Sequence, residues 1–189
     1  DRGAQSAGAA EWLQRPYFHA VRGNHEQLYL YWRSLRTHRS RQKSFEHDVY
    51  FPNGGHWVAK VPEAEHRQIE QMLTRLPYVV VVPAKDGELV AAVHASLPDG
   101  SSWPHFAQKP LSQKSVHSML WCRNRILHHQ GDRRAEPVWD EGMVPGLHAV
   151  VCGHVAVPRP TWVGRFCHIE TCGWLPNGHF SVVPLSHIV

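Results

Sequence analysis

The stretch YVVVVPAKDGELVAAVHAS, residues 78–96, predicts two strands joined by a tight turn. Two apolar runs, YVVVV (Tyr78–Val82) and ELVAAV (Glu88–Val93), flank the segment PAKDG. Within that segment Asp86-Gly87 supplies the positive φ that a tight hairpin turn needs. The second run ends at His94, a side chain that can bind a metal or carry a proton. The hairpin therefore predicts a sheet with a chemically active residue at a strand end.

The patterns on either side of this hairpin predict further strands and helices. Upstream, YFHAV (Tyr17–Val21) predicts a strand, and two helices are expected from the apolar stripe Leu28, Tyr31, Trp32 and Leu35 and from the stripe Ile69, Met72, Leu73 and Leu76 within Pro62–Leu76. Downstream we expect a helix over part of Gln113–Ile126, a buried strand LHAVVC (Leu147–Cys152), and strands RFCHIE and HFSVVPL joined by a hairpin at Asn177-Gly178. Strands that alternate with helices favour an α/β or α+β layered domain.

Composition predicts one soluble domain spanning residues 1–189. A chain of 189 residues, 42% hydrophobic, can bury one sizeable core. No apolar run is long enough for a membrane span, and the start lacks a secretory signal, so we expect a cytoplasmic protein without a membrane partner. The four cysteines have no framework spacing and are expected to be reduced core residues.

The net charge of +4 and pI of about 9.0 point only weakly to anionic partners. The basic segment Trp32–Lys43 contains Arg33, Arg36, Arg39, Arg41 and Lys43 with no acidic residue between them. We interpret it as a solvated helix end and loop, in preference to a nucleic-acid patch. Arg125 is likewise interpreted as a charge on a helix surface.

Three apolar runs end in a histidine, or in an asparagine and a histidine together: HAVRGNHE, VAAVHAS and AVVCGHV. Loops beyond the carboxyl ends of parallel strands meet in one crevice, so Asn24, His25, His94 and His154 could meet there. Imidazole and amide donors suit manganese, iron or zinc. The alternative, equally open from spacing alone, is that each histidine is an ordinary surface or core residue. A glycine beside a ligand, such as Gly153, would let backbone and metal approach closely.

The motifs RGNHE, VHA and GH, in this order, resemble the metal motifs of the calcineurin-like metallophosphoesterases, and among these the PPP-type protein phosphatases. The stretches NGGHW, LPYVVVV, HASLPD, LWCRNRI and IETCG are similar to the bacterial and lambda-phage branch of that family. The resemblance implies a β-sandwich flanked by helices. It also implies two divalent metal ions, commonly Mn²⁺ with Fe or Zn possible, that hold a bridging hydroxide for attack on phosphorus.

Carried over by position, the resemblance assigns roles to individual residues. Asn24, His94 and His154 would bind one metal, and His25 would donate a proton to the leaving group, with Asp1 orienting it. Arg2 and Arg123 would bind phosphate, because a guanidinium offers paired donors to phosphoryl oxygens. Arg22 would bind phosphate or form a supporting salt bridge to the loop.

The chain departs from the family pattern in places. The family's GDxHG motif and the leading Gly-Asp of GDxxDRG are absent, so only one neutral set of metal ligands is present. We therefore expect an N-terminally truncated fragment that is weak or inactive by itself, whereas the intact parent is an enzyme. IETCG and GHV stand where the family usually has IDTG and GHT.

The expected function is a metal-dependent phosphomonoesterase acting on phosphoserine or phosphothreonine in proteins. Two alternatives remain open at this point. One is a symmetrical dinucleoside tetraphosphatase, and the other is a non-catalytic remnant that binds phosphate or nucleic acid. The expected partner is a phosphoprotein or a small phosphate ester, with nucleic acid disfavoured and the oligomeric state left open.

Overall fold

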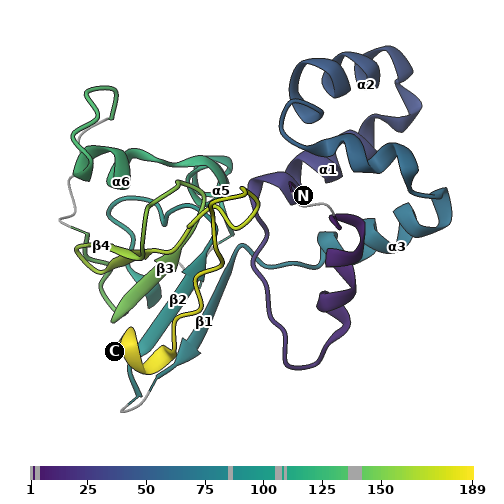
Figure 1. Cartoon of the computed structure of the whole chain (residues 1–189). Coiled ribbons are helices and arrows are strands. Elements are labelled where there is room, and N and C mark those ends of the chain that lie inside the picture. The colour runs from purple at the N-terminus through teal and green to yellow at the C-terminus, as the bar shows by residue number, and fades with distance from the viewer. Residues whose placement is uncertain (1, 3–4, 85–86, 105–107, 109, 136–141) are drawn as a thin grey trace. The chain divides into compact units, whose positions relative to one another are not determined.

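The chain forms two compact units in a computed structural model, Asp1–Pro77 and Tyr78–Val189 (Figure 1). The structure describes all residues except 1, 3–4, 85–86, 105–107, 109 and 136–141. In this described part, no helix is long and apolar enough to cross a membrane. The assignment of residues 1–189 to a single domain stays a prediction.

The first unit is helical in its described residues. Its elements are η1 (Ala7–Gln14), α1 (Asn24–Ser34), η2 (Leu35–Thr37), α2 (Arg39–Phe45), η3 (Glu46–Tyr50), η4 (Gly55–Lys60) and α3 (Glu63–Thr74). Both predicted helices are thus confirmed, as α1 and α3. The predicted strand Tyr17–Val21 is wrong: these residues are turn and irregular chain, and Tyr17 is exposed. A β-rich run becomes a strand only beside a partner strand, and this unit has none among its described residues.

Helix α1 begins where a glycine and a glutamate cap it. The Gly23 N–H donates to Oε2 of Glu26 at 2.9 Å, which satisfies one of the donors that a helix start leaves open. The buried stripe runs through Leu28, Tyr29 and Trp32, each at most 8% exposed, whereas the predicted Tyr31 is 50% exposed. Leu28, Trp32 and Leu35 of the predicted stripe are thus buried, and Tyr29 takes the place of Tyr31, because at 3.6 residues per turn either position fits the same helix face.

Arg33 is buried inside the first unit, which corrects the interpretation of the basic segment as solvated throughout. Its guanidinium donates to both carboxylate oxygens of Glu63, at 2.9 and 2.7 Å, and to Oε2 of Glu70 at 3.1 Å. Arg36 also reaches Glu70, at 3.4 Å. Two of the five cations are therefore paired with acidic side chains of α3. This pairing further weakens the hypothesis that the basic segment binds nucleic acid.

The second unit contains a five-stranded mixed sheet of order β1-β2-β3-β5-β4. Its strands are β1 (Val79–Pro83), β2 (Leu89–Val93), β3 (Ala149–Cys152), β4 (Thr161–Val163) and β5 (Phe166–His168). The β1–β2 hairpin is confirmed, with Gly87 at φ 80°, while Lys85 and Asp86 of its turn lie outside the described residues. Strands β2, β3 and β5 are parallel neighbours. The α/β class is thus confirmed as a mixed sheet with helices, and the β-sandwich stays a prediction.

The hairpin predicted at the C-terminus is wrong. Strand β5 pairs with β4, a strand that the patterns missed, through a turn at Gly164 with φ 59°. The segment HFSVVPL forms no named strand, and Phe180 in it is 86% exposed. A Cβ on Gly178 would overlap the carbonyl oxygen of Cys172. This glycine therefore serves a close backbone approach and not a hairpin turn.

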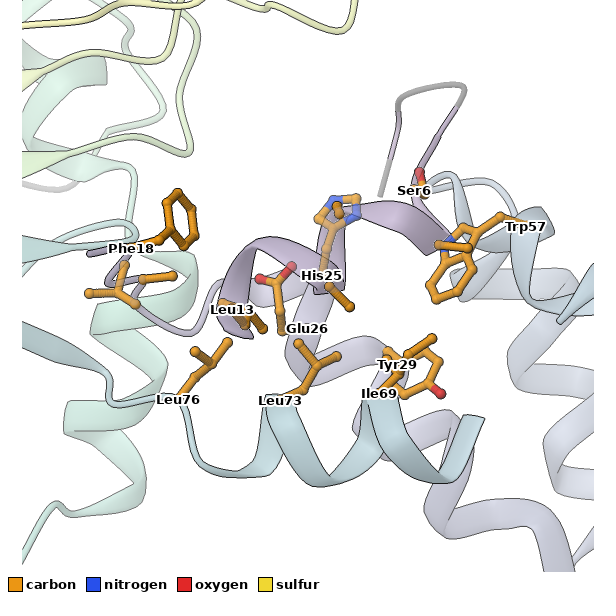
Figure 2. Close-up of a pocket in the computed structure, with 15 residues that line it drawn as sticks. Ser6, Leu13, Phe18, His25, Glu26, Tyr29, Trp57, Ile69, Leu73 and Leu76 are labelled. Carbon is orange, nitrogen blue, oxygen red and sulfur yellow. The ribbon is translucent and has the colours of Figure 1, made fainter. Parts of the chain in front are cut away.

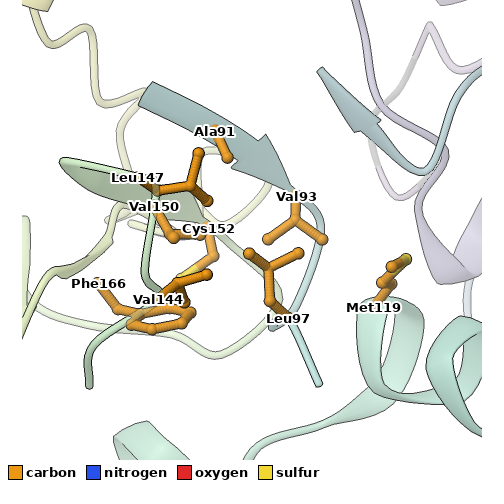
Figure 3. Close-up of a cluster of buried hydrophobic side chains, with 9 residues drawn as sticks. All are labelled: Ala91, Val93, Leu97, Met119, Val144, Leu147, Val150, Cys152 and Phe166. Atoms are coloured by element: carbon orange, nitrogen blue, oxygen red, sulfur yellow. The ribbon is translucent and has the colours of Figure 1, made fainter. Parts of the chain in front are cut away.

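Apolar side chains cover both faces of the central strands β2 and β3, which are themselves apolar. One face packs a cluster drawn in Figure 3: Ala91, Val93, Leu97, Met119, Val144, Leu147, Val150, Cys152 and Phe166. The opposite face packs Val90, Ala149, Cys167 and Ile188. All four cysteines are free, and Cys152 and Cys167 are buried, as predicted. This covered sheet is a rigid support for the loops at its strand ends.

Two helices replace the one expected over Gln113–Ile126. They are α5 (Gln113–Trp121), capped by the Ser112 hydroxyl, and α6 (Asn124–His129). Cys122 between them is extended, with ψ 131°. The Ala95 N–H donates to the Met119 carbonyl at 2.8 Å. The end of α5 is thereby tied to the loop that carries His94.

Candidate functional site

His94 and His154 lie next to each other at the carboxyl ends of two parallel strands. Val93 pairs with Cys152 in the β2–β3 register, so each histidine follows the same edge of the sheet. The Gly153 N–H donates to the His94 carbonyl at 2.9 Å. Nε2 of His94 faces Nδ1 of His154 at 3.1 Å. The predicted meeting of strand-end histidines is confirmed for this pair.

The backbone at His154 is held in a tight turn. Its φ is 68°, which is uncommon for a residue with a side chain. The Val155 N–H donates to the Gly153 carbonyl at 2.8 Å, closing a three-residue γ-turn around His154. Conformations of this kind cost about 1–3 kcal/mol and gather at functional sites. A Cβ at Gly153 would meet only ordinary contacts, so the positive φ, and not space at the glycine, distinguishes this loop.

Trp121, the last residue of α5, and Arg123, the residue before α6, flank the His154 ring. Nε of Arg123 donates to Nε2 of His154 at 3.3 Å. The indole of Trp121 meets the imidazole edge to face, with centroids 6.1 Å apart and planes at 90°. Because Arg123 can only donate, Nε2 of His154 accepts and its proton sits on Nδ1, from which it donates to His94. The motifs named Arg123 as a site residue and missed Trp121, which stands two positions before it.

The facing nitrogens fit a shared divalent ion. Two nitrogens that bind one ion at about 2.0–2.1 Å lie roughly 3 Å apart, and the His94–His154 pair is separated by 3.1 Å. In the first unit, Oδ1 of Asn24 is buried and has no hydrogen-bond partner among the described residues, as suits an oxygen reserved for a ligand. No group of three or more His, Cys, Asp or Glu side chains in the described part of the chain forms a metal cluster.

The other predicted site residues belong to the first unit. Arg22 braces its loop: Nη2 donates to the Thr74 carbonyl at 2.5 Å, and Nη1 to Oε1 of Gln27 at 3.5 Å. These contacts favour the supporting role of Arg22 over phosphate binding. Arg2 is exposed, and Asp1, predicted to orient His25, lies outside the described residues. Asn24 and His25 open α1, in a unit separate from His94 and His154.

His25 lines a pocket of about 220 Å³ in the first unit (Figure 2). Its walls are mostly apolar, with Ala10 from η1, Leu73 from α3 and the ring of Tyr29, which stacks on Trp57 at 5.5 Å. An apolar cavity of about 150 Å³ accepts benzene, so this pocket can hold one aromatic ring. Burial and, less strongly, the charge of Arg2 lower the pKa of His25 to about 4. A proton donor here needs an anion close by to raise that pKa.

Arg125 is a buried part of the second unit, which corrects its interpretation as a helix-surface charge. It is 4% exposed, and its guanidinium lies 4.0 Å from the centre of the Phe166 ring. Nη2 donates to Oδ1 of Asp99 at 3.3 Å. This contact ties α6 to the loop that follows His94. Arg125 therefore stabilises the loop that follows His94, through its contact with Asp99, and is not a phosphate ligand.

A buried thiol and imidazole lie beside Arg125. Sγ of Cys152 is 3.3 Å from Nδ1 of His168, and Nε2 of His168 is buried with no partner among the described residues. Burial and, next, the charge of Arg125 lower the pKa of His168 to about 4. Burial also raises the pKa of the Cys152 thiol. The Cys152 thiol and the His168 imidazole are therefore neutral at pH 7 and pack in the core.

The second unit is expected to lose stability in mild acid because of His168. Its folded pKa, about 4, lies below the ordinary histidine pKa of 6.5, so the unfolded chain binds the extra proton between these values. Stability is complete above about pH 6.5 and falls as the pH drops toward 4. At about pH 4.5 the loss reaches roughly 2.5 kcal/mol, at 1.36 kcal/mol per pKa unit.

Urea unfolding of the wild-type chain and a His168→Gln variant, at about pH 7 and pH 4.5, tests this expectation. The pKa values of His25 and His66 in the first unit are lowered as well, so some acid loss remains in the variant. The variant should lose less stability on acidification than the wild type. Equal losses in the two proteins would contradict the assignment to His168.

The known proteins to which this chain is similar include two phosphatases. The chain is 26% identical over 185 residues to serine/threonine-protein phosphatase 2 of Salmonella typhimurium, which covers 96% of this chain and 73% of the relative. It is 30% identical over 135 residues to serine/threonine-protein phosphatase 1 of the same organism, covering 69% of this chain and 55% of the relative. No family model matches the chain. The relatives confirm the resemblance to PPP-type phosphatases that the motifs indicated.

Proposed function

We propose that this chain, a relative of the serine/threonine-protein phosphatases, contributes a divalent-metal site that hydrolyses phosphoserine or phosphothreonine in proteins. The observation that carries the proposal is the His94–His154 pair, whose facing nitrogens are 3.1 Å apart at the carboxyl edge of the sheet. Manganese is the proposed metal, with iron or zinc as alternatives suited to the same donors. When bound, the metal lowers the pKa of water and neutralises charge on the phosphoryl group.

Each site residue has a separate task in this proposal. His94 and His154 offer Nε2 and Nδ1 to the metal, and the amide oxygen of Asn24 stays a donor expected from the family resemblance alone. For Nδ1 of His154 to bind a cation, its proton must move to Nε2, and Nε2 then no longer accepts from Arg123. Arg123 is thereby released to bind a phosphoryl oxygen. Metal loading and phosphate binding would therefore support each other.

His25 is the proposed proton donor to the leaving oxygen. Its pKa of about 4 leaves the imidazole neutral at pH 7 in the described structure. A phosphoryl dianion close by would raise this pKa, because an opposite charge favours the protonated ring. His25 would thus gain its proton with the substrate bound.

The function is tested by release of inorganic phosphate from a phosphoserine peptide, with Mn²⁺ and with a chelator. We expect weak release that depends on Mn²⁺, because the motifs of this chain supply only one set of metal ligands. Diadenosine tetraphosphate is assayed in parallel, and cleavage of that compound alone would replace the protein-phosphatase proposal with the tetraphosphatase one. Absence of metal-dependent hydrolysis of either compound would overturn the proposal for this chain.

Arg123→Met is expected to raise KM for a phosphate ester by about 10- to 100-fold. A hydrogen bond to a charged group contributes about 1.5–3 kcal/mol, which corresponds to that range. Affinity for Mn²⁺, measured by calorimetry, should not fall, because Arg123 donates to His154 and does not bind the metal. Arg159→Met, at an exposed position of the same unit, is the matched control. An unchanged KM would exclude Arg123 from phosphate binding.

A further inference from the structure

The His154 ring depends on its neighbours for its orientation. The γ-turn fixes the backbone, at φ 68°, but a single side-chain rotation still turns the imidazole away from His94. The side chains that contact the ring include His94 at 3.1 Å, Arg123 at 3.3 Å, and Trp121 edge to face. His94 is the proposed partner in metal binding. Of the other two, Trp121 and Arg123, each contacts the ring from the segment that follows Leu120 and can restrict its rotation.

Trp121 is less exposed than Arg123, since its side chain is half-buried. It ends α5 directly after Met119 and Leu120, which are 0% and 2% exposed. The Met119 carbonyl accepts from Ala95, next to His94, at 2.8 Å. Arg123 is exposed, and a long exposed side chain keeps much of its rotamer freedom. Trp121 therefore belongs to the same rigid support as the loop of His94.

We propose that Trp121 is a positioning residue, which holds the His154 imidazole so that its Nδ1 faces Nε2 of His94. An edge-to-face ring pair has a preferred geometry, and a flat indole at 90° to the imidazole restricts the rotation that would separate the two nitrogens. The metal-binding part of this proposal rests on the proposed function. The orientation of the ring does not, since it exists in the chain without metal.

The test compares Trp121→Leu with Trp121→Phe in the full chain. Phenylalanine keeps an aromatic ring at this place, whereas leucine keeps apolar bulk without one. Calorimetry should show Mn²⁺ binding about tenfold weaker in Trp121→Leu, as for other residues that orient metal-binding histidines, and nearly restored in Trp121→Phe. Trp162→Leu, at a 42% exposed position on β4, is the matched control and should bind as the wild type does.

A second measurement reports the orientation of the His154 imidazole in the absence of metal. Nitrogen-15 NMR of the histidine side chains should show a protected Nδ1–H of His154, identified by its loss in His154→Asn. Trp121→Phe should keep this signal and Trp121→Leu should lose it, while thermal unfolding shows both variants folded. If Trp121→Leu keeps the signal, or if the two variants behave alike, the proposal is overturned. Absence of Mn²⁺ binding in the wild type would count against the proposed function, and the NMR signal would still decide the role of Trp121.

Discussion

His154→Asn is expected to abolish Mn²⁺ binding at the strand-end site and to lower kcat/KM for a phosphate ester by about 10³-fold, equivalent to roughly 4 kcal/mol of transition-state stabilisation. Asparagine tolerates positive φ better than most residues, so the γ-turn at φ 68° is preserved. The variant therefore removes the imidazole with little strain. The loss would follow from the missing metal donor opposite Nε2 of His94, which lies 3.1 Å from Nδ1 of His154.

The measurement is calorimetric titration with Mn²⁺ together with initial rates on p-nitrophenyl phosphate. His128→Asn makes the same change at an exposed position of α6 and serves as the control. It should leave both quantities unchanged. Retained metal affinity in His154→Asn would remove His154 from the ligand set and, with it, the main support for the proposed function.

Arg33→Ala is expected to destabilise the first unit by about 2–3 kcal/mol. The side chain is 4% exposed, and it joins α1 to two carboxylates of α3, at 2.7 Å to Glu63 and 3.1 Å to Glu70. Removing one partner of a buried pair costs about 3–5 kcal/mol. Glu63 is 56% exposed and can be solvated again, so we expect a smaller loss.

Urea unfolding, followed by a signal from the first unit, measures this loss. Arg36→Ala is the control, because Arg36 is 55% exposed and reaches only Glu70, at 3.4 Å. An exposed pair of this kind contributes less than about 1 kcal/mol. Similar losses in the two variants would mean that burial of Arg33 adds nothing to its ion pairs. A double substitution with Glu70→Ala would then separate the pairwise coupling from the lost packing.

The strand-end histidines were predictable because a local pattern carries them. An apolar run that ends in a histidine predicts both the strand and the position of the side chain, and β2 with His94 and β3 with His154 follow that rule. Register then places the two residues together, since parallel neighbours end at the same edge. The third run of this kind, HAVRGNHE, departs from the rule: in the described part of the chain no strand precedes Asn24 and His25, which instead begin α1.

The buried arginines were not predictable, because their partners are far away in the sequence. Arg33 pairs with Glu63, 30 residues on, and Arg125 with Asp99, 26 residues before it. A run of cations without local acids looks solvated in sequence, and only the packing of α1 on α3 supplies the carboxylates. Trp121 was missed for a related reason. An aromatic residue near the end of a helix predicts a core contact, and nothing local shows that its neighbour is His154.

The order of the strands has a consequence for how fast the second unit folds. Strands β1 and β2 join through a local turn, whereas Val90 of β2 pairs with Ala149 of β3 only after a long loop is closed. Closing such a loop lowers the entropy of the chain before the contacts between the strands can form and stabilise it. We expect the hairpin to form early and the parallel pairing to limit the rate. The His94–His154 pair would then be among the last features to assemble, because the two residues come together only when β2 and β3 pair.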